Sequence, residues 1–345
     1  MKKLFFIAAI AGVALVSCTK NEVAPIAQQD EITFLSPVVG PQTKVYGEIG
    51  AKYNEEESFD VWCVHNTGDI TDWGGTEYFS DVKATYDAGL GGWALTPKYY
   101  WPATGKLSFV ALSPSIDKTT SYDQDGFKIT GWMQGNTEKT IVDLMYSDIA
   151  KNKAKADYNT DGDEKAGDAN QYKGVDITFN HALSYIVFKV KTAADYSTTT
   201  KFQLNKITLS GVYTAGDFDQ SQLLDPWTED TSGEKGTYIA FTSAGLAFDS
   251  FAAVDAEAKE GEEIILLPQA LTEGQQKITI NYQISTDNGT TWIDQVQEVD
   301  IKNTTVEAWE MGKKYTYSLS IGMQEILLDP AVTDWAVTDG GEISF

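Results

Sequence analysis

The clearest structural signal in this sequence is the run KITINYQI at Lys277–Ile284, which alternates polar and apolar residues without interruption. Such alternation puts successive side chains on opposite faces and is typical of a β-strand with one buried face. The turn residues Asp287, Asn288 and Gly289 follow, and Thr291–Ile293 opens a second β-patterned run. Because Asn and Gly tolerate a positive φ, this stretch predicts a β-hairpin.

Runs of the same kind recur along the chain, separated by Gly, Asp and Asn. Only Ser147–Ala156, which is rich in Ala and Lys, shows weak helical spacing. Many short strands separated by turns predict an all-β fold with a β-sandwich in each half, rather than a parallel α/β sheet. The other runs are Glu31–Ser36, Phe59–Val64, Gly92–Tyr100, Lys106–Leu112, Gly126–Thr130, Val175–Phe179, Ser184–Lys191, Phe202–Leu209, Gly261–Pro268, Lys314–Ile321 and Glu325–Leu328.

A boundary between two domains is expected near the polar stretch Asp195–Thr200, which reads as a linker. The length of 345 residues suits about two domains of ~150 residues each. We therefore expect an N-terminal sandwich over residues 31–194 and a C-terminal sandwich over residues 195–345.

The first residues have the layout of a bacterial secretory signal peptide. Lys2 and Lys3 precede the uncharged apolar run Leu4–Val16, which is too short for a comfortable transmembrane span. The end of this run, followed by Ser17 and Cys18, resembles the lipobox of bacterial lipoproteins. The expected arrangement is a signal peptide over residues 1–17, lipidation of Cys18 and a polar tether over residues 18–30. An ordinary cleaved signal with an incidental cysteine is the alternative.

The composition excludes some classes of partner. The net charge is −24, and all 26 basic residues are lysine, with no arginine. A nucleic-acid partner would require basic phosphate contacts, so none is expected. An apolar content of 42% provides for a sizeable core.

Catalytic motifs are lacking. The sequence contains no HExxH, GxSxG, Walker A, GxGxxG or CxxC motif, and its only histidines are His65 and His181. His181 is expected to be a hydrogen-bonded structural residue, and Cys63 a small buried apolar residue. A pair of carboxylates could serve a glycosidase, but nothing in the sequence marks one pair. We therefore expect a protein without enzymatic activity.

One acidic loop matches the calcium-loop template in part. Asp157, Asn159 and Asp161 occupy positions 1, 3 and 5, a glycine occupies position 6, and Asp163 and Asp168 stand at positions 7 and 12. The alternation can bring several oxygen ligands around one Ca²⁺ ion. Position 12 is Asp instead of Glu, and a strand is expected to follow, not a helix. A solvated acidic loop is the alternative.

Several short sequence motifs, taken together, resemble those of the fimbrillins of Bacteroidales, and they cover nearly the whole chain that follows the signal peptide. The resemblance implies two transthyretin-like β-sandwich domains and a role as a subunit of a surface fimbria, a type V pilus. The motifs are Trp93, Tyr99–Pro102, Leu107–Ala111, Pro114, Asp143–Tyr146, Phe179–Ser184, Leu204–Gly211, Leu266–Gln269, Thr333–Trp335 and Gly340–Gly341.

The resemblance also implies a mechanism of assembly. An outer-membrane lipoprotein, held by its lipid, would lose its tether and its first strand, Glu31–Ser36, when a surface protease cuts between Lys44 and Val45. A strand from the next subunit would then fill the groove, which is β-augmentation. The expected donor is the C-terminal stretch that includes Glu325–Leu328 and Glu342–Phe345.

The residue at the expected cut is a departure from the family pattern. Related subunits are cut after Arg, whereas Lys44 stands here. An uncut chain would stay lipidated as an anchor subunit. A surface glycan-binding lipoprotein that uses exposed Trp is a further alternative. A stalk, tip or anchor role and a host or bacterial surface ligand are left open.

Overall fold

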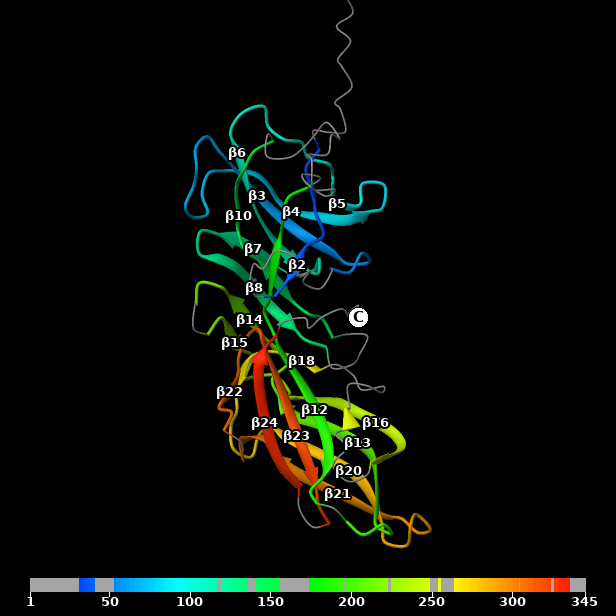
Figure 1. The fold of residues 1–345 in the computed structure, drawn as a ribbon. Helices are drawn as coiled ribbons and strands as arrows, with labels where there is room; N and C mark the ends of the chain where they lie inside the picture. Colours follow the sequence, from blue (N-terminus) through cyan, green and yellow to red (C-terminus); the bar gives the residue numbers. More distant parts are fainter. Residues whose placement is uncertain are drawn as a thin grey trace, which may run out of the picture.

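The computed structural model describes residues 31–40, 53–116, 119–135, 141–155, 174–194, 196–222, 225–248, 254–255, 264–303, 305–323 and 326–335. These residues form 24 strands and one short 3-10 helix, η4 (Ile301–Asn303). The expected all-β class is confirmed. Figure 1 shows an elongated arrangement, with β3 (Ser58–Asn66) and β6 (Lys106–Ser113) toward one end and β20 (Lys277–Ser285) and β21 (Ile293–Asp300) toward the other.

The largest sheet has nine strands and belongs to the N-terminal half. Its strands lie in the order β1-β5-β4-β3-β6-β9-β11-β2, and β10 pairs with β6. Its two outermost strands, β1 and β2, are neighbours in the sequence, joined by Leu35–Pro37. The bounds are β1 (Thr33–Phe34), β2 (Val38–Val39), β3 (Ser58–Asn66), β4 (Thr76–Asp87), β5 (Gly92–Thr96), β6 (Lys106–Ser113), β9 (Met145–Ser147), β10 (Ala150–Lys153) and β11 (Thr178–His181).

The central strands of this sheet are buried on both faces. Phe59, Val61 and Cys63 of β3 point into one core, whereas Trp62 points into a second core on the opposite face. Cys63 is fully buried, and this burial raises the pKa of its thiol. The expectation of a buried apolar cysteine is therefore confirmed.

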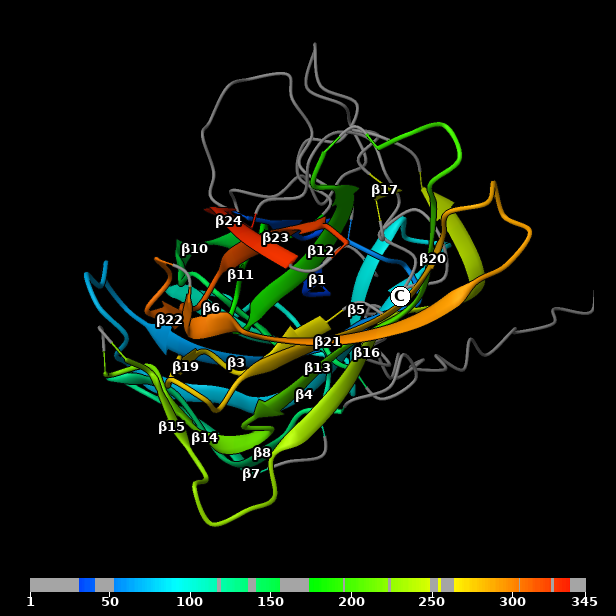
Figure 2. The same ribbon diagram turned by 90° about the horizontal axis from the view of Figure 1, so that it is seen from below.

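A four-stranded sheet covers the second core and combines strands from both halves of the sequence. Its order is β15-β14-β8-β7, and β8 pairs antiparallel with β14. Figure 2, seen along the long axis, shows this sheet as a separate layer at one side of the molecule. Its bounds are β7 (Thr119–Asp123), β8 (Gly126–Met133), β14 (Ala215–Asp219) and β15 (Trp227–Glu229).

The C-terminal half contains a sandwich of two sheets. One sheet has the order β17-β12-β23-β24 with β18 on β12, and the other has the order β16-β13-β20-β21. A two-stranded sheet of β19 (Gln269–Ala270) and β22 (Ala308–Trp309) lies beside them. The bounds are β12 (Ser184–Thr192), β13 (Lys201–Val212), β16 (Gly236–Phe248), β17 (Val254–Asp255), β18 (Ile264–Leu266), β20 (Lys277–Ser285), β21 (Ile293–Asp300), β23 (Lys313–Ile321) and β24 (Ile326–Asp334).

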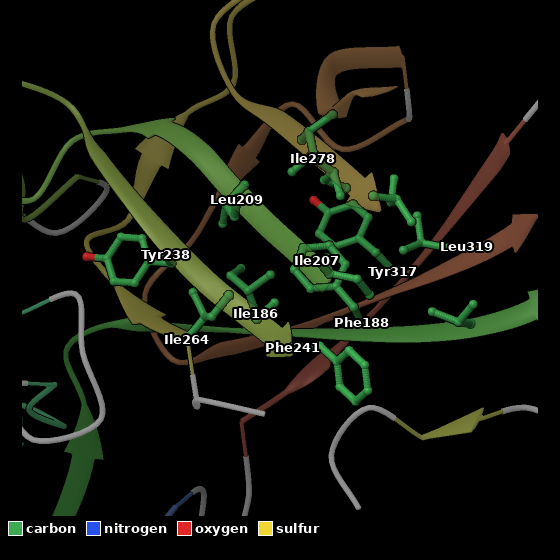
Figure 3. Close-up of a cluster of buried hydrophobic side chains, with 14 of the residues drawn as sticks. Ile186, Phe188, Ile207, Leu209, Tyr238, Phe241, Ile264, Ile278, Tyr317 and Leu319 are labelled. Atoms are coloured by element: carbon green, nitrogen blue, oxygen red, sulfur yellow. The ribbon is translucent and has the colours of Figure 1, made fainter. Parts of the chain in front are cut away.

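The core of this sandwich is built from the alternation that the sequence shows. Ile278 and Ile280 of β20 are fully buried, and the polar residues that alternate with the buried ones along this strand are half-buried. In Figure 3, the side chains of β12 and β23, such as Phe188 and Tyr317, meet those of β13, such as Ile207. The hairpin turn is also observed, because Asn288 has a φ of 56° and Gly289 a φ of 86°.

Two features differ from the simplest division of the chain. Strand β12 precedes the expected boundary at residues 194 and 195, yet it pairs in parallel with β23 of the C-terminal sandwich. The division at that position stays a prediction. The helical spacing of Ser147–Ala156 was misleading, because this stretch contains strand β10, which pairs with β6.

Candidate functional site

Most of the site residues predicted from the sequence lie outside the described residues. This applies to Cys18, to Lys44 and Val45, and to all five candidate calcium ligands, so these assignments stay predictions. The candidate ligands are Asp157, Asn159, Asp161, Asp163 and Asp168. Among the residues that the structure does describe, no group of three or more His, Cys, Asp or Glu could hold a metal ion. The same part of the chain contains no helix that is long and apolar enough to span a membrane.

The segment predicted to be removable, at the start of the described chain, is inserted between two edges of the nine-stranded sheet. On one side, β1 pairs antiparallel with β5, and the Ile32 amide donates to the Tyr99 carbonyl at 2.8 Å. On the other side, β2 pairs in parallel with β11, and the Gly40 amide donates to the Phe179 carbonyl at 3.1 Å. The segment Glu31–Gly40, which we call the closing segment, therefore joins both edges of this sheet.

The middle of the closing segment also pairs with the residues that lead into β11. The Val175 amide donates to the Thr33 carbonyl at 2.8 Å, and the Leu35 amide donates to the Val175 carbonyl at 3.1 Å. The Val38 amide donates to the Ile177 carbonyl at 3.0 Å. Backbone groups at both ends and in the middle of the closing segment thus have partners, as a strand inside a sheet requires.

The closing segment puts two large apolar side chains into the first core. Ile32 and Phe34 are fully buried, which confirms that they share one face of the strand. The Phe34 ring packs edge-on against Phe59 and Phe109, with ring centroids 5.7 and 5.6 Å apart. Burying a side chain of this size contributes about 1.5–3 kcal/mol, and each aromatic contact adds about 0.5–1.5 kcal/mol.

A buried carboxylate marks the beginning of the closing segment. The Lys98 ammonium donates to Glu31 Oε2 at 2.7 Å, and this hydrogen bond raises the pKa of Lys98. The Glu31 side chain is only 2% exposed, whereas that of Lys98 is 53% exposed. Glu31 Oε1 is buried without a hydrogen-bond partner, so Lys98 is the main compensation for this charge.

Two glycines leave room for the backbone of the closing segment. A Cβ atom on Gly92 would lie 2.6 Å from the Phe34 carbonyl oxygen. A Cβ atom on Gly174 would lie 2.6 Å from the Phe34 carbonyl carbon and 2.7 Å from the Leu35 amide nitrogen. Since real Cβ atoms do not approach so closely, any other residue at Gly92 or Gly174 would push the closing segment away.

Downstream of the predicted cut, the chain is fixed to the same core by Tyr53. Its ring stacks on Phe179 with centroids 5.6 Å apart, and it meets Trp93 edge-on at 5.5 Å. The phenol forms a hydrogen bond of 2.6 Å with the Ser113 hydroxyl, and burial raises the pKa of Tyr53. The rest of the core therefore holds the chain independently of the closing segment.

The consequence of this geometry is a site that is filled by a strand. Without the closing segment, β5 and β11 would be unpaired edges, and the aromatic faces that contact Phe34 would be exposed. An open edge beside an apolar groove is a template for pairing with another strand. The site holds an extended strand, which in this structure is the closing segment of the same chain.

A second polar cluster lies where the two halves of the molecule meet. The His181 imidazole is buried and pairs with Asp143 through Nδ1 at 2.9–3.0 Å, as expected for a structural histidine. The Trp335 indole stacks on His181. The Gln134 amide nitrogen donates to the Val142 carbonyl and, across the junction, to the Ile265 carbonyl at 2.7 Å. These contacts connect the two halves of the molecule.

Most of the tryptophans lie in the cores of the protein and not on its surface. Six of the nine are buried, and Trp73, Trp101 and Trp292 are half-buried. Trp73 packs edge-on against Tyr122 and Trp101 against Phe109, so their rings are engaged within the protein. This burial fits the expectation that tryptophan serves the core of the sandwiches.

Comparison with protein families identifies the chain. A profile described as fimbrillin-like matches residues 43–335, which is most of the sequence. The chain belongs to the fimbrillin-like family. The matched part begins after the closing segment, which ends at Gly40. Comparison with curated protein sequences gave no match.

Solved structures share the fold of this fimbrillin-like protein. A fimbrial protein from Bacteroides vulgatus ATCC 8482 has a TM-score of 0.60 at 17% identity, with 88% of this chain and 99% of the other covered. A candidate cell adhesion protein from Bacteroides uniformis ATCC 8492 has a TM-score of 0.53 at 17% identity, over 89% and 99%. Another from Bacteroides ovatus ATCC 8483 has a TM-score of 0.50 at 14% identity, over 90% and 99%. At these identities the likeness shows the fold alone.

Sequence reasoning found the strand of the fimbrillin-like site but not the features around it. Lys98, Gly92 and Gly174 contact the closing segment from positions far along the chain, and no local pattern marks them. The parallel strand β2, Val38–Val39, was also missed, because it lies between Pro37 and Gly40.

Proposed function

We propose that this fimbrillin-like protein is a structural or adhesion subunit of surface fimbriae. In this proposal it is exported as a lipoprotein and assembled by proteolysis and donor-strand exchange. The observation that carries the proposal is the closing segment, whose residues pair with both edges of one sheet and fill its core. Membership of the family supports a fimbrial, non-enzymatic role at the cell surface.

The closing segment acts, in this proposal, as a temporary strand. It keeps the groove filled while the protein travels to the surface, held by lipid on Cys18. A cut between Lys44 and Val45 would separate it from the rest of the chain, which Tyr53 anchors to the core. A strand from a second subunit would then pair with β5 and β11. That second subunit would in turn accept a strand from a third subunit, so that a fibre grows.

The test uses the purified chain with and without a cut at Lys44. We expect limited digestion with a lysine-cutting protease to give a new start at Val45, read by N-terminal sequencing, and ladders on unheated gels. The Lys44→Ala variant serves as the matched control and is expected to stay monomeric. A chain that starts at Val45, has lost the closing segment and is still a monomer contradicts strand exchange.

A lipidated anchor subunit is the second candidate, and the lysine at position 44 favours it. A protease specific for Arg has no site in the chain, since the sequence contains no arginine. An uncut protein keeps its closing segment and cannot accept a donor strand. N-terminal sequencing of surface protein decides: a start at Val45 supports a polymerising subunit, and an intact acylated Cys18 supports the anchor.

A calcium ion in the acidic loop remains part of the proposal as a stabilising ligand. The oxygen donors at Asp157, Asn159, Asp161, Asp163 and Asp168 match the ligand types that Ca²⁺ prefers. Isothermal titration of Ca²⁺ into the wild type and an Asp157→Ala/Asp161→Ala variant tests this assignment. The absence of heat for the wild type at millimolar Ca²⁺ contradicts it.

A further inference from the structure

The four residues that start the closing segment recur near the other end of the sequence. Glu31-Ile32-Thr33-Phe34 matches Glu342-Ile343-Ser344-Phe345 in three identities and one exchange of Thr for Ser. We propose that the Glu342–Phe345 segment of a second copy of this chain takes the place of Glu31–Phe34, residue for residue. This inference rests on the proposed strand exchange and defines its register.

The side chains of the closing segment show why these residue types fit. The position of Phe34 lies between the rings of Phe59 and Phe109, and Ile32 is fully buried on the same face. Phe345 and Ile343 have the same two-residue spacing, so both reach the same face of a strand in this register. A shift by one residue would turn both toward the opposite face.

The carboxylate position adds a charge to this match. Glu31 is buried and compensated by Lys98, whose ammonium lies 2.7 Å from Oε2. Removal of the closing segment would leave the Lys98 ammonium without this carboxylate, and Glu342 would supply one at the same place. Because burying a carboxylate away from a cation is costly, the pair selects one register of the incoming strand.

The direction of the strand favours a second copy over the same chain. The last residue of the closing segment, Gly40, pairs with Phe179. His181 lies two residues after Phe179, and Trp335 stacks on it. Trp335 therefore lies near the Gly40 end of the closing segment. Figure 1 shows the closing segment in blue running toward the C-terminal half, where β24 ends. A strand in the direction of Glu31 to Phe34 must enter from the opposite end. The residues that follow Trp335 would have to run back along the closing segment and then reverse.

The test is a defined complex of one acceptor and one donor. The acceptor lacks residues 342–345 and is cut after Lys44, with the protease then inactivated. The donor is the uncut chain with Lys44→Ala, which keeps its own closing segment. Size-exclusion chromatography and native mass spectrometry measure the complex. We expect a 1:1 complex with the wild-type donor segment and its loss when residues 342–345 are deleted.

Charge reversal tests the register. A Glu342→Lys donor is expected to bind the acceptor at least tenfold more weakly. Binding of the Glu342→Lys donor should recover on an acceptor that carries Lys98→Glu. This acceptor also carries Glu31→Gln, so that its uncut precursor does not place two carboxylates side by side. Asp339→Lys reverses a charge outside the match and is the control, with binding unchanged.

The outcomes separate this inference from the proposed function. Equal binding by donors with and without residues 342–345 leaves strand exchange standing and overturns the inference. A cut acceptor that binds no donor at all overturns both. In a third outcome, the cut chain that lacks residues 342–345 binds the donor, but the cut wild-type chain does not. That result would show that the wild-type chain fills the groove with its own C-terminal segment, and it overturns the assignment to a second copy.

Discussion

The indole of Trp335 lies flat on the imidazole of His181, with ring centroids 3.7 Å apart and planes inclined by 4°. Both rings are buried, and Asp143 holds the imidazole from its edge. The Trp335 amide also donates to the Gly312 carbonyl at 2.8 Å. The end of β24 is therefore fixed at the junction between the two halves of the molecule.

Replacement of Trp335 tests how much this junction contributes to stability. Trp335→Ala removes a buried ring from the second core, and such losses cost about 3–5 kcal/mol in the free energy of unfolding. Trp335→Phe keeps a ring for stacking and is expected to cost less. Urea unfolding measures the stability of both variants. If Trp335→Ala lowers the free energy of unfolding by less than about 0.5 kcal/mol, the stacking does not stabilise the fold.

Phe34→Ala is expected to loosen the closing segment rather than the whole fold. The lost ring contacts lie on the closing segment, while Tyr53 holds the downstream chain. We expect faster hydrogen exchange at the Leu35, Val38 and Val175 amides and unchanged exchange in β20. Leu35→Ala is the control, because Leu35 is half-buried and lies outside the core clusters. Equal effects of Phe34→Ala on the closing segment and on β20 contradict this prediction.

Gly92→Ala is expected to displace the closing segment without a new charge or cavity. The added methyl group would meet the Phe34 carbonyl oxygen at 2.6 Å. Gly74→Ala is the control, since a Cβ atom there meets nothing within 4 Å and should change stability by less than about 0.5 kcal/mol. Limited proteolysis of the closing segment measures the effect. Equal cleavage rates for the two variants would show that the close approach is tolerated.

The pair of Glu31 and Lys98 is expected to respond asymmetrically to substitution. Lys98→Met leaves the buried Glu31 carboxylate without its cation, whereas Glu31→Gln leaves an exposed lysine that water solvates. Hydrogen exchange at the Ile32 amide should therefore accelerate more in Lys98→Met than in Glu31→Gln. The double variant should resemble Glu31→Gln. The reverse order of the two single variants would contradict a buried, compensated carboxylate.

The hairpin turn after β20 predicts a dependence of stability on pH. Asp287 accepts hydrogen bonds from the Thr291 hydroxyl at 2.6 Å, the Thr291 amide at 2.8 Å and the Ser285 hydroxyl at 2.8 Å. These bonds, those from Thr291 foremost, lower the pKa of Asp287 from 3.8 to about 2. Because the unfolded chain then binds the proton more tightly, the stabilisation is complete above about pH 4 and is lost as pH falls to about 2.

The variant Asp287→Asn checks this prediction. The difference in unfolding free energy between wild type and variant should be largest above pH 4 and shrink toward pH 2. A carboxyl titration followed by NMR should give a pKa of about 2 for Asp287. A difference that is constant across this range would show that the turn does not favour the ionised carboxylate.

The strands with strict alternation could be predicted from the sequence, because burial of one face is written into a local pattern. Lys277–Ile284, which alternates strictly, corresponds to β20. Ser184–Lys191 corresponds to β12 and was predictable as a dense apolar run, since Ile186, Val187 and Phe188 follow one another. Two long strands were missed. In β4 the outward face carries charges and Asp81 has a φ of 55°, and in β16 the pairing shifts register near Gly245, which has a φ of 120°. Such irregularities obscure the period of two.

At the candidate site, the sequence showed the strand and its two inward side chains but not its surroundings. Ile32 and Phe34 alternate locally, so their shared face was predictable. The partners Lys98 and Gly174 are separated from them by long stretches of chain, and only folding brings them together. The repetition of the first tetrapeptide near the end of the sequence gains meaning only once the positions of Glu31 and Phe34 are known.

The anchoring of Trp335 has a mechanical consequence for a fibre built in the proposed way. Six residues, Ala336–Gly341, lie between this anchor and Glu342. Even fully extended, a connection of this length spans at most about 20–25 Å. Neighbouring subunits would be joined by a short connection that starts at the fixed position of Trp335. Such a connection restricts bending and rotation between the subunits. The fibre would behave as a stiff rod with a constant axial repeat, and its length would count its subunits.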